Sequence, residues 1–221
     1  MDRLYYMISV LIVMLAFLAF AWRFERGAGK DGNGEETHQK RIQKPRTREL
    51  VLIAVLCALT VAGRVAFFML PQFKPMAAMI ILAAVCYGKE TGFLVGSVSA
   101  FVSNFFFGQG PWTPWQMLAF GLVGYLAGIC FYRKKKPVSK RSLCSFGFLA
   151  VVLLYGGIVN PASLLMYSQE VTWPAILAVY MSGLPFDLMH AAATVLFLWL
   201  LADEMQEKLL RIKKKYGLMN Q

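Results

Sequence analysis

Long apolar runs, separated by short polar stretches, fill most of this 221-residue chain. A helix rises about 1.5 Å per residue, so a run of about 20 residues crosses a hydrocarbon layer of about 30 Å. Most runs reach that length, although the third is short and prolines interrupt the last two. A soluble domain is excluded, because one globular core would not bury so much apolar surface. The pattern predicts seven transmembrane helices, near residues 4–22, 50–70, 75–88, 91–107, 114–132, 143–167 and 173–202.

The basic residues predict how these helices are oriented. The formal net charge is +11, and twenty of the 23 Lys and Arg residues lie in alternate loops, at 23–48, 89, 133–141 and 208–215. Loops rich in Lys and Arg stay on the cytoplasmic side of a membrane. We therefore expect the N-terminus outside the cell and the C-terminus in the cytoplasm. Because topology accounts for the charge, no nucleic acid is expected as a partner.

The fold class predicted is an all-α integral membrane protein, in which one extra N-terminal helix precedes a six-helix unit. Residues 1–22 are expected to form this anchor, which is not read as a cleaved signal because its positive charges follow the apolar run. Residues 23–48, rich in Gly, Glu, Lys and Arg, are expected to form a basic, flexible cytoplasmic linker. The six-helix unit spans 49–205, and a basic cytoplasmic tail covers 206–221.

The run from 49 to 70 carries two separate features. Ala54, Ala58 and Ala62 recur every four residues, so they form one stripe of small side chains that lets another helix approach closely. Arg64 lies near the predicted outer end of the same helix, where a charge within the membrane is costly and is often functional. An arginine so near the interface can also snorkel to the surface.

The turn at residues 104–116, NFFFGQGPWTPWQ, holds the densest chemistry of the chain. Glycines and prolines break the helix there, and aromatic side chains crowd around the break. One interpretation is an aromatic belt at the membrane surface. The other is a lid over a solute pocket, with polar groups that form hydrogen bonds and rings that contact a ring-bearing ligand. The lid hypothesis assigns ligand contacts to Asn104, Gln109, Trp112, Thr113 and Trp115.

Arg64 has aromatic and basic neighbours shortly after it in the sequence. Phe68 follows it by one helical turn, and Phe73 and Lys74 lie in the next turn, at residues 71–75. A cation among aromatic rings suits a partly polar, ring-containing solute. Arg64, Phe68, Phe73 and Lys74 are therefore further candidates for substrate contacts.

The last run contributes Asp187 and His190, which are three residues apart and share one face of a helix. A carboxylate in an apolar span needs a partner or a wet cavity, and Arg64 is the obvious charge partner. Contact between Asp187 and the solute is one interpretation, and a structural polar pair that locks helices together is equally open. Asn160 precedes a proline that can bend its helix, which leaves the amide free to face the same solute.

Several classes of site are absent from the sequence. It has no GxxxxGK[ST] loop for ATP, no HExxH, no GxSxG and no Gly-rich dinucleotide fingerprint. Its four cysteines show no CxxC or Cys/His spacing. We therefore predict no catalytic residue, no metal and no cofactor, so any energy source must come from another protein.

Three stretches resemble a known family: the AxxxA stripe at 54–62, the turn GQGPWTPWQ with the LAFGLVGYLAG after it, and GLPFDLMHA in the last run. They are similar to the substrate-specific S component of energy-coupling factor (ECF) transporters, the vitamin uptake systems of prokaryotes. The resemblance covers roughly residues 48–205, and it implies six helices with both ends in the cytoplasm. It also implies an outer solute pocket that is closed by the loops at 71–75 and 108–113.

The same resemblance implies partners and a place in the cell. A transmembrane coupling subunit and two ABC-type ATPases would dock on the small-residue face, which falls on Ala54, Ala58 and Ala62. The location implied is the lipid bilayer of a prokaryotic plasma membrane, and the ligand is a vitamin-like small molecule. The turn is most similar to members assigned to cobalamin or its precursors. The extra N-terminal helix departs from the usual pattern of the family.

Three other functions remain open from the residues alone. A stand-alone secondary transporter would use Asp187 and His190 as a proton relay. A membrane enzyme would use them as acid and base, but the spans contain no second catalytic carboxylate and no nucleophile motif. A structural anchor would bind no solute at all.

Overall fold

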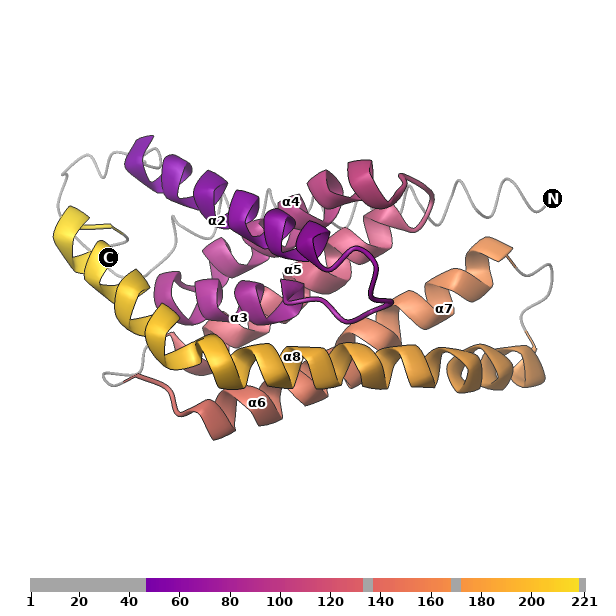
Figure 1. Cartoon of the computed structure of the whole chain (residues 1–221). Coiled ribbons are helices and arrows are strands. Elements are labelled where there is room, and N and C mark those ends of the chain that lie inside the picture. The colour runs from indigo at the N-terminus through magenta and orange to yellow at the C-terminus, as the bar shows by residue number, and fades with distance from the viewer. Residues whose placement is uncertain (1–46, 133–136, 168–171, 219–221) are drawn as a thin grey trace, which may run out of the picture.

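The computed structural model describes residues 47–132, 137–167 and 172–218, which are almost entirely helical (Figure 1). These residues contain no strand, so the predicted all-α class is confirmed. The predicted anchor at 1–22 and nearly all of the linker at 23–48 lie outside the described residues. In chain order the helices are α2 (Thr47–Ala66), α3 (Met76–Tyr87), α4 (Lys89–Phe107), α5 (Thr113–Phe131), α6 (Lys140–Leu149), the π-helical segment η1 (Ala150–Tyr155), α7 (Gly156–Tyr167) and α8 (Trp173–Tyr216).

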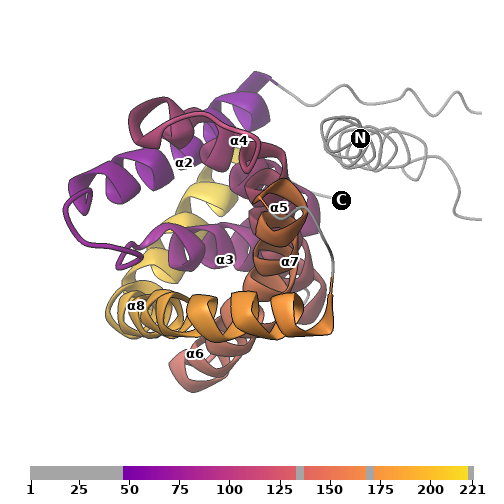
Figure 2. The ribbon, with the colours of Figure 1, turned by 90° about the vertical axis from the view of Figure 1, so that its right-hand side faces the viewer.

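The described helices pack side by side in one bundle (Figures 1 and 2). α6, η1 and α7 follow one another without a break and form one continuous helical segment. We call each continuous helical segment that runs along the bundle a pass, so the described residues form six passes. Four passes are long and apolar enough to span a membrane: residues 47–66, 113–131, 140–167 and 173–216. We name the two ends of the bundle by their residues. The Arg64 end holds the loops α2–α3 and α4–α5, and the basic end holds the start of α2 and the end of α8.

Helix α3 is the core of the bundle. All twelve of its residues are buried, which explains why the third apolar run is short. Twelve helical residues extend only about 18 Å, less than a hydrocarbon layer, but a helix enclosed by protein need not match the lipid. Gly88 alone separates α3 from α4, and its φ of 104° is a conformation that side chains disfavour. The chain therefore reverses at the basic end through a single glycine.

Glycines bring α4 and α5 into close contact. A Cβ atom on Gly124 would lie 2.2 Å from the carbonyl oxygen of Gly92, and one on Gly96 would lie 2.3 Å from that of Phe120. Both distances are far below a van der Waals contact, so the backbones of the two helices touch directly. Small residues allow this approach in membrane bundles. The crossing fixes the start of α5 beside the end of α4, where the α4–α5 loop begins.

Local signals set the ends of the later helices. Ser139 caps α6 by accepting a hydrogen bond from the amide of Ser142 at 3.3 Å, and Thr172 caps α8 through the amide of Ala175 at 3.4 Å. At the junction of η1 and α7 the amide of Gly156 bonds to the carbonyl of Val151, five residues back. Such a wide turn is rare and is often found at functional sites.

Helix α8 continues well beyond the apolar run that predicted it. The sequence places a tail at 206–221, but α8 remains helical through Tyr216 and packs across the basic end. Gln206 is 1% exposed; its Nε2 donates to the carbonyl of Val138 at 3.1 Å, and its Oε1 accepts from the amide of Val138 at 2.9 Å. The Nζ of Lys213 donates to the carbonyl of Cys86 at 3.1 Å and to the hydroxyl of Tyr132 at 3.0 Å. The boundary at 206 therefore falls inside a helix.

Replacing Gln206 with alanine is expected to lower the thermal stability of the bundle. The buried amide and carbonyl of Val138 would lose their partners, at a cost of about 2 kcal/mol. For a unit of this size that corresponds to a fall in Tm of roughly 4 to 8 °C. Thermal unfolding of purified protein in detergent measures it, with the exposed neighbour Glu207→Ala as control. Equal Tm values for the two variants would contradict the role assigned to Gln206.

Candidate functional site

Arg64 lies in the last turn of α2 and points into the bundle, where only 9% of the residue is exposed. Its NH1 donates to the Oδ1 of Asn104 at 2.9 Å and also to the Oγ of Ser103. Both acceptors are neutral and both lie on α4. The side chain therefore joins two helices inside the protein, and it does not snorkel to the surface.

Asn104 connects Arg64 to the α4–α5 loop. Its Nδ2 donates to the Oγ1 of Thr113 at 3.0 Å and to the Oε1 of Gln116 at 2.9 Å. Thr113 in turn donates to the Oε1 of Gln109 at 2.9 Å, and the Nε2 of Gln109 donates to the carbonyl of Phe101 at 2.9 Å. Hydrogen bonds among its own side chains and to the last turns of α4 therefore hold the α4–α5 loop in place. Among the described residues, the side-chain amide of Asn104 alone links this network to the buried guanidinium of Arg64.

Phe107 lies between two cations. The guanidinium carbon of Arg64 is 4.4 Å from the centre of its ring, and the Nζ of Lys74 is 4.8 Å from it. The ring of Phe68 packs against it at 4.9 Å between centroids. We call Arg64, Lys74, Asn104, Phe107 and Thr113 the Arg64 cluster. The sequence did not single out Phe107, although its spacing of three from Asn104 puts both on one face of α4.

The α2–α3 loop packs against α8 through a second group of rings. Phe73 lies 6.3 Å from Phe67 and 5.7 Å from Phe197, and Phe67 lies 5.1 Å from Phe197. Phe73 therefore fixes the loop that carries Lys74, and it does not contact the ring of Phe107 directly. Phe197 was missed by sequence reasoning, because one phenylalanine in a long apolar run has no distinguishing signal.

The two tryptophans of the turn differ in their surroundings. Trp112 covers Gly110, since a Cβ atom there would lie 2.4 Å from its ring. Trp115 is partly buried, and its Nε1 has no hydrogen-bond partner among the described residues. Neither ring is part of the contacts around Phe107. The structure therefore joins Asn104, Gln109 and Thr113 in one network and leaves both tryptophans beside it.

Asp187 forms a separate group with residues of η1 and α7. Its Oδ2 accepts a hydrogen bond from the Nδ2 of Asn160 at 2.7 Å, so the two polar candidates of the last passes do meet. Among the described residues Asp187 makes no ion pair with Arg64. The charge pair that the sequence left open does not form among these residues, because α8 directs the carboxylate toward α7 and α2 directs the guanidinium toward α4.

His190 lies one turn further along α8 and is 4% exposed. Its ring packs edge-on against Tyr155 at 4.9 Å and against Phe120 at 5.8 Å, and its Nδ1 has no partner among the described residues. We call Tyr155, Asn160, Asp187 and His190 the Asp187 cluster. Helix α5 connects the two clusters, because Gln116 bonds to Asn104 and Phe120, four residues later, packs against Tyr155 at 4.6 Å.

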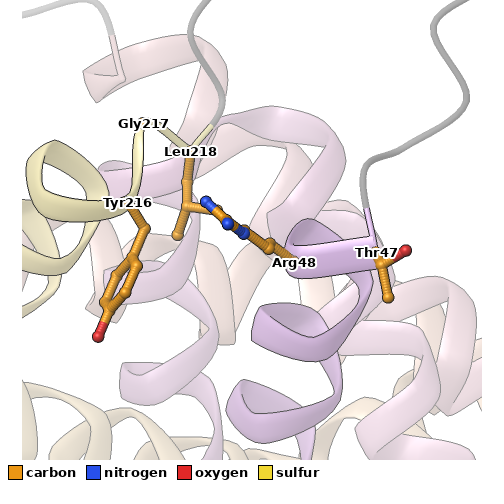
Figure 3. Close-up of a pocket in the computed structure, with 5 residues that line it drawn as sticks. All are labelled: Thr47, Arg48, Tyr216, Gly217 and Leu218. Atoms are coloured by element: carbon orange, nitrogen blue, oxygen red, sulfur yellow. The ribbon is translucent and has the colours of Figure 1, made fainter.

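A cavity of about 300 Å³ lies at the basic end, far along α2 from Arg64 (Figure 3). Arg48 extends from the first turn of α2 toward Gly217 and Leu218, where α8 ends. Arg48 is the only charged residue among its five lining residues, which are Thr47, Arg48, Tyr216, Gly217 and Leu218. Tyr216 is the one aromatic residue of this lining, whereas several aromatic rings and polar side chains converge at the Arg64 end. No group of three His, Cys, Asp or Glu side chains suited to a metal ion occurs among the described residues.

Asn104→Ala is expected to loosen the α4–α5 loop. The change removes one of the two acceptors of Arg64 and the donor to Thr113 and Gln116. Amide hydrogen exchange at residues 108–113 should rise by about tenfold for each 1.4 kcal/mol of lost stabilisation. Ser182→Ala, on an exposed part of α8, is the control. Unchanged exchange in the loop would show that Asn104 does not hold it.

Comparisons with known proteins bear on this arrangement. The family model described as "ECF-type riboflavin transporter, S component" matches residues 44–207. A UPF0397 protein of Vibrio atlanticus is 32% identical over 123 residues, which are 52% of this chain and 67% of that protein. One of Aliivibrio fischeri is 33% identical over 112 residues, 48% of this chain and 61% of that protein. One of Aliivibrio salmonicida is 37% identical over 87 residues, 37% of this chain and 47% of that protein.

Proposed function

The chain belongs to the family of ECF-type riboflavin transporter S components, and on that basis we propose that its cargo is a ring-bearing vitamin bound at the Arg64 cluster. S components are the substrate-binding membrane subunits of ECF transporters, and they are not enzymes. The chain therefore supplies recognition in a multi-pass membrane importer. We propose that the Arg64 cluster recognises the cargo outside the cell and that the assembled transporter delivers the cargo inward.

One observation carries the proposal: a buried guanidinium, that of Arg64, is linked through Asn104 to the α4–α5 loop. A solute that contacts Arg64 would change the hydrogen bonds that hold this loop. Binding and loop closure would then be coupled, as a lid requires. The rings of Phe68 and Phe107 beside the guanidinium supply flat apolar contacts for a ring system.

ECF S components work with a transmembrane coupling subunit and ATPases. We assign the docking face to Ala54, Ala58 and Ala62, which are exposed on one side of α2. Small side chains on an unpartnered helix face let a second helix pack closely without a fixed interlock, which suits a face that must attach and release. The proposed arrangement has the Arg64 end outside the cell and the basic end in the cytoplasm, in line with the basic loops.

Two observations suggest which vitamin to test first: the name of the matching family model and the similarity of the α4–α5 turn to known members. The matching family model is named for riboflavin, whose three fused rings suit the aromatic surroundings of Arg64. The turn GQGPWTPWQ is similar to members assigned to cobalamin or its precursors. Riboflavin is therefore the first ligand to test, and cobalamin the second.

The test is to purify the full chain from cells grown with both vitamins and to identify any retained solute by mass spectrometry. A bound flavin is yellow and fluorescent, and a bound corrinoid is red. Arg64→Ala and Phe107→Ala are expected to lower the affinity for that solute by tenfold or more, the effect of about 1.4 kcal/mol. If both variants bind as tightly as the unaltered protein, the Arg64 end is not the binding site. Absence of any saturable binding would reject the function itself.

A further inference from the structure

The Arg64 cluster has an excess of positive charge among the described residues. Arg64 is buried, yet its hydrogen-bond acceptors are the neutral Ser103 and Asn104. Only its NH1 takes part in these bonds, so within the described residues the donors on Nε and NH2 have no acceptor. A buried cation without a counter-ion is costly, and buried charges are ordinarily paired.

Lys74 adds a second cation on the same aromatic ring. Its Nζ lies 4.8 Å from the centre of Phe107, whose ring is also 4.4 Å from the guanidinium carbon of Arg64. Burial lowers the pKa of Lys74, and the nearby charge of Arg64 lowers it further. The two cations therefore destabilise each other in the absence of an anion.

The carboxylates of the described residues offset this charge only in part, and none of them forms an ion pair with Arg64 or Lys74. Asp187 accepts its hydrogen bond from Asn160. Among the described residues, counting Arg64 and Lys74 as +1 each and Asp187 as −1 leaves a net charge of +1 at the Arg64 end. The other carboxylates that the structure describes lie toward the basic end, where Glu49 begins α2 and ion pairs join Glu90 to Lys89, Asp203 to Lys140, Glu204 to Lys208 and Glu207 to Arg211.

We infer that the cargo carries an anionic group, a carboxylate or a phosphate, that pairs with the free donors of Arg64 and with Lys74 while its ring system lies against Phe107 and Phe68. A planar guanidinium offers two parallel donors to such a group, and an ammonium adds a point charge. The anion removes the mutual repulsion of the two cations, so the ligand itself completes the electrostatics of the site. This inference rests on the proposed function and narrows its substrate class from ring-bearing solutes to anionic ring-bearing solutes. Among flavins it therefore places riboflavin 5′-phosphate ahead of neutral riboflavin.

Matched pairs of probes test the charge separately from the ring. Riboflavin and its 5′-phosphate share one ring system and differ by a phosphate, and nicotinamide and nicotinate differ by an amide and a carboxylate. Binding of each probe to the purified full chain in a neutral detergent is measured at low and at high salt. We expect the anionic member of at least one pair to bind about tenfold more tightly, the effect of one charge-assisted contact. That advantage should shrink at high salt.

Lys74→Gln should reduce the advantage of the anionic probe over its neutral counterpart several-fold. Lys74 is partly exposed in the α2–α3 loop, so Lys74→Gln leaves the buried core unchanged, whereas Arg64→Gln alters a buried residue. Lys214→Gln, on the exposed end of α8, is the matched control and should have no effect.

The outcomes distinguish the inference from the function on which it rests. Equal or tighter binding of the neutral members overturns the inference while the proposed function stands. If the solute retained through purification is neutral or cationic at pH 7, the inference is likewise overturned and the proposed function stands. If the retained solute is an anion, the inference is supported. If no probe binds saturably and no solute is retained, the proposed function fails and the inference fails with it.

Discussion

Ala58→Trp is expected to abolish vitamin uptake by cells while leaving vitamin binding by the purified protein intact. Ala58 is in the middle of the exposed stripe on α2, more than one turn from Arg64 and on a different face of the helix. An indole ring there would hold an approaching helix several ångströms away, and packing between membrane helices depends on close contact. The separation of the two effects is the signature of a docking surface.

Uptake of labelled vitamin and binding to purified protein are the two measurements. Leu153→Trp is the matched control, because Leu153 is 69% exposed on η1, away from α2. It adds the same ring to another exposed face and should leave uptake unchanged. Normal uptake by Ala58→Trp would reject the docking face. Steady uptake into liposomes by this protein alone, driven by a proton gradient, would reject dependence on a coupling subunit and ATPases.

Gly124→Leu is expected to have the largest effect on the fold. The first atom of the new side chain would lie 2.2 Å from the backbone oxygen of Gly92, and backbone atoms of a packed helix cannot move aside as a flexible side chain can. Overpacking of this kind costs about 3 kcal/mol or more. A loss of that size lowers Tm by roughly 6 to 12 °C in a unit of this length.

Thermal unfolding in detergent measures this effect, and Gly157→Leu is the control. No atom lies within 4 Å of the position that a Cβ on Gly157 would take, so the same side chain has open space there. Leucine also favours a helix more than glycine does, by up to about 1 kcal/mol. We expect Gly157→Leu to match or exceed the unaltered protein in Tm. Similar losses in the two variants would show that the α4–α5 contact is not tight.

Much of the fold could be predicted because helix formation in a membrane follows local rules. The apolar run at 91–107 corresponds to α4 at 89–107, and the run at 114–132 corresponds to α5 at 113–131. The main difference is at the C-terminal end of α8: the apolar run ends near residue 202, whereas the helix continues to Tyr216. Residues such as Gln206 and Leu209 continue the buried face at helical spacing, but intervening charges ended the apolar run.

The candidate site was predicted in part. The polar residues of the turn, Asn104, Gln109 and Thr113, do form one network, because they are close in sequence at a single helix end. Contacts between distant segments were beyond reach. Arg64 and Asp187 carry opposite charges but do not pair, and Phe197 joins the α2–α3 loop from more than a hundred residues away.

The sequence by itself determined the membrane class, the positions of the helices, the small-residue stripe on α2 and the kinds of chemical group at the Arg64 end. Those properties depend on composition and spacing along a single helix, which are local. The tertiary structure alone decided which groups meet: Arg64 with Asn104, Phe107 between two cations, and Asp187 with Asn160. These contacts depend on the rotation of each helix about its own axis. That rotation is fixed by packing, as at the glycines of α4 and α5, and no local pattern encodes it.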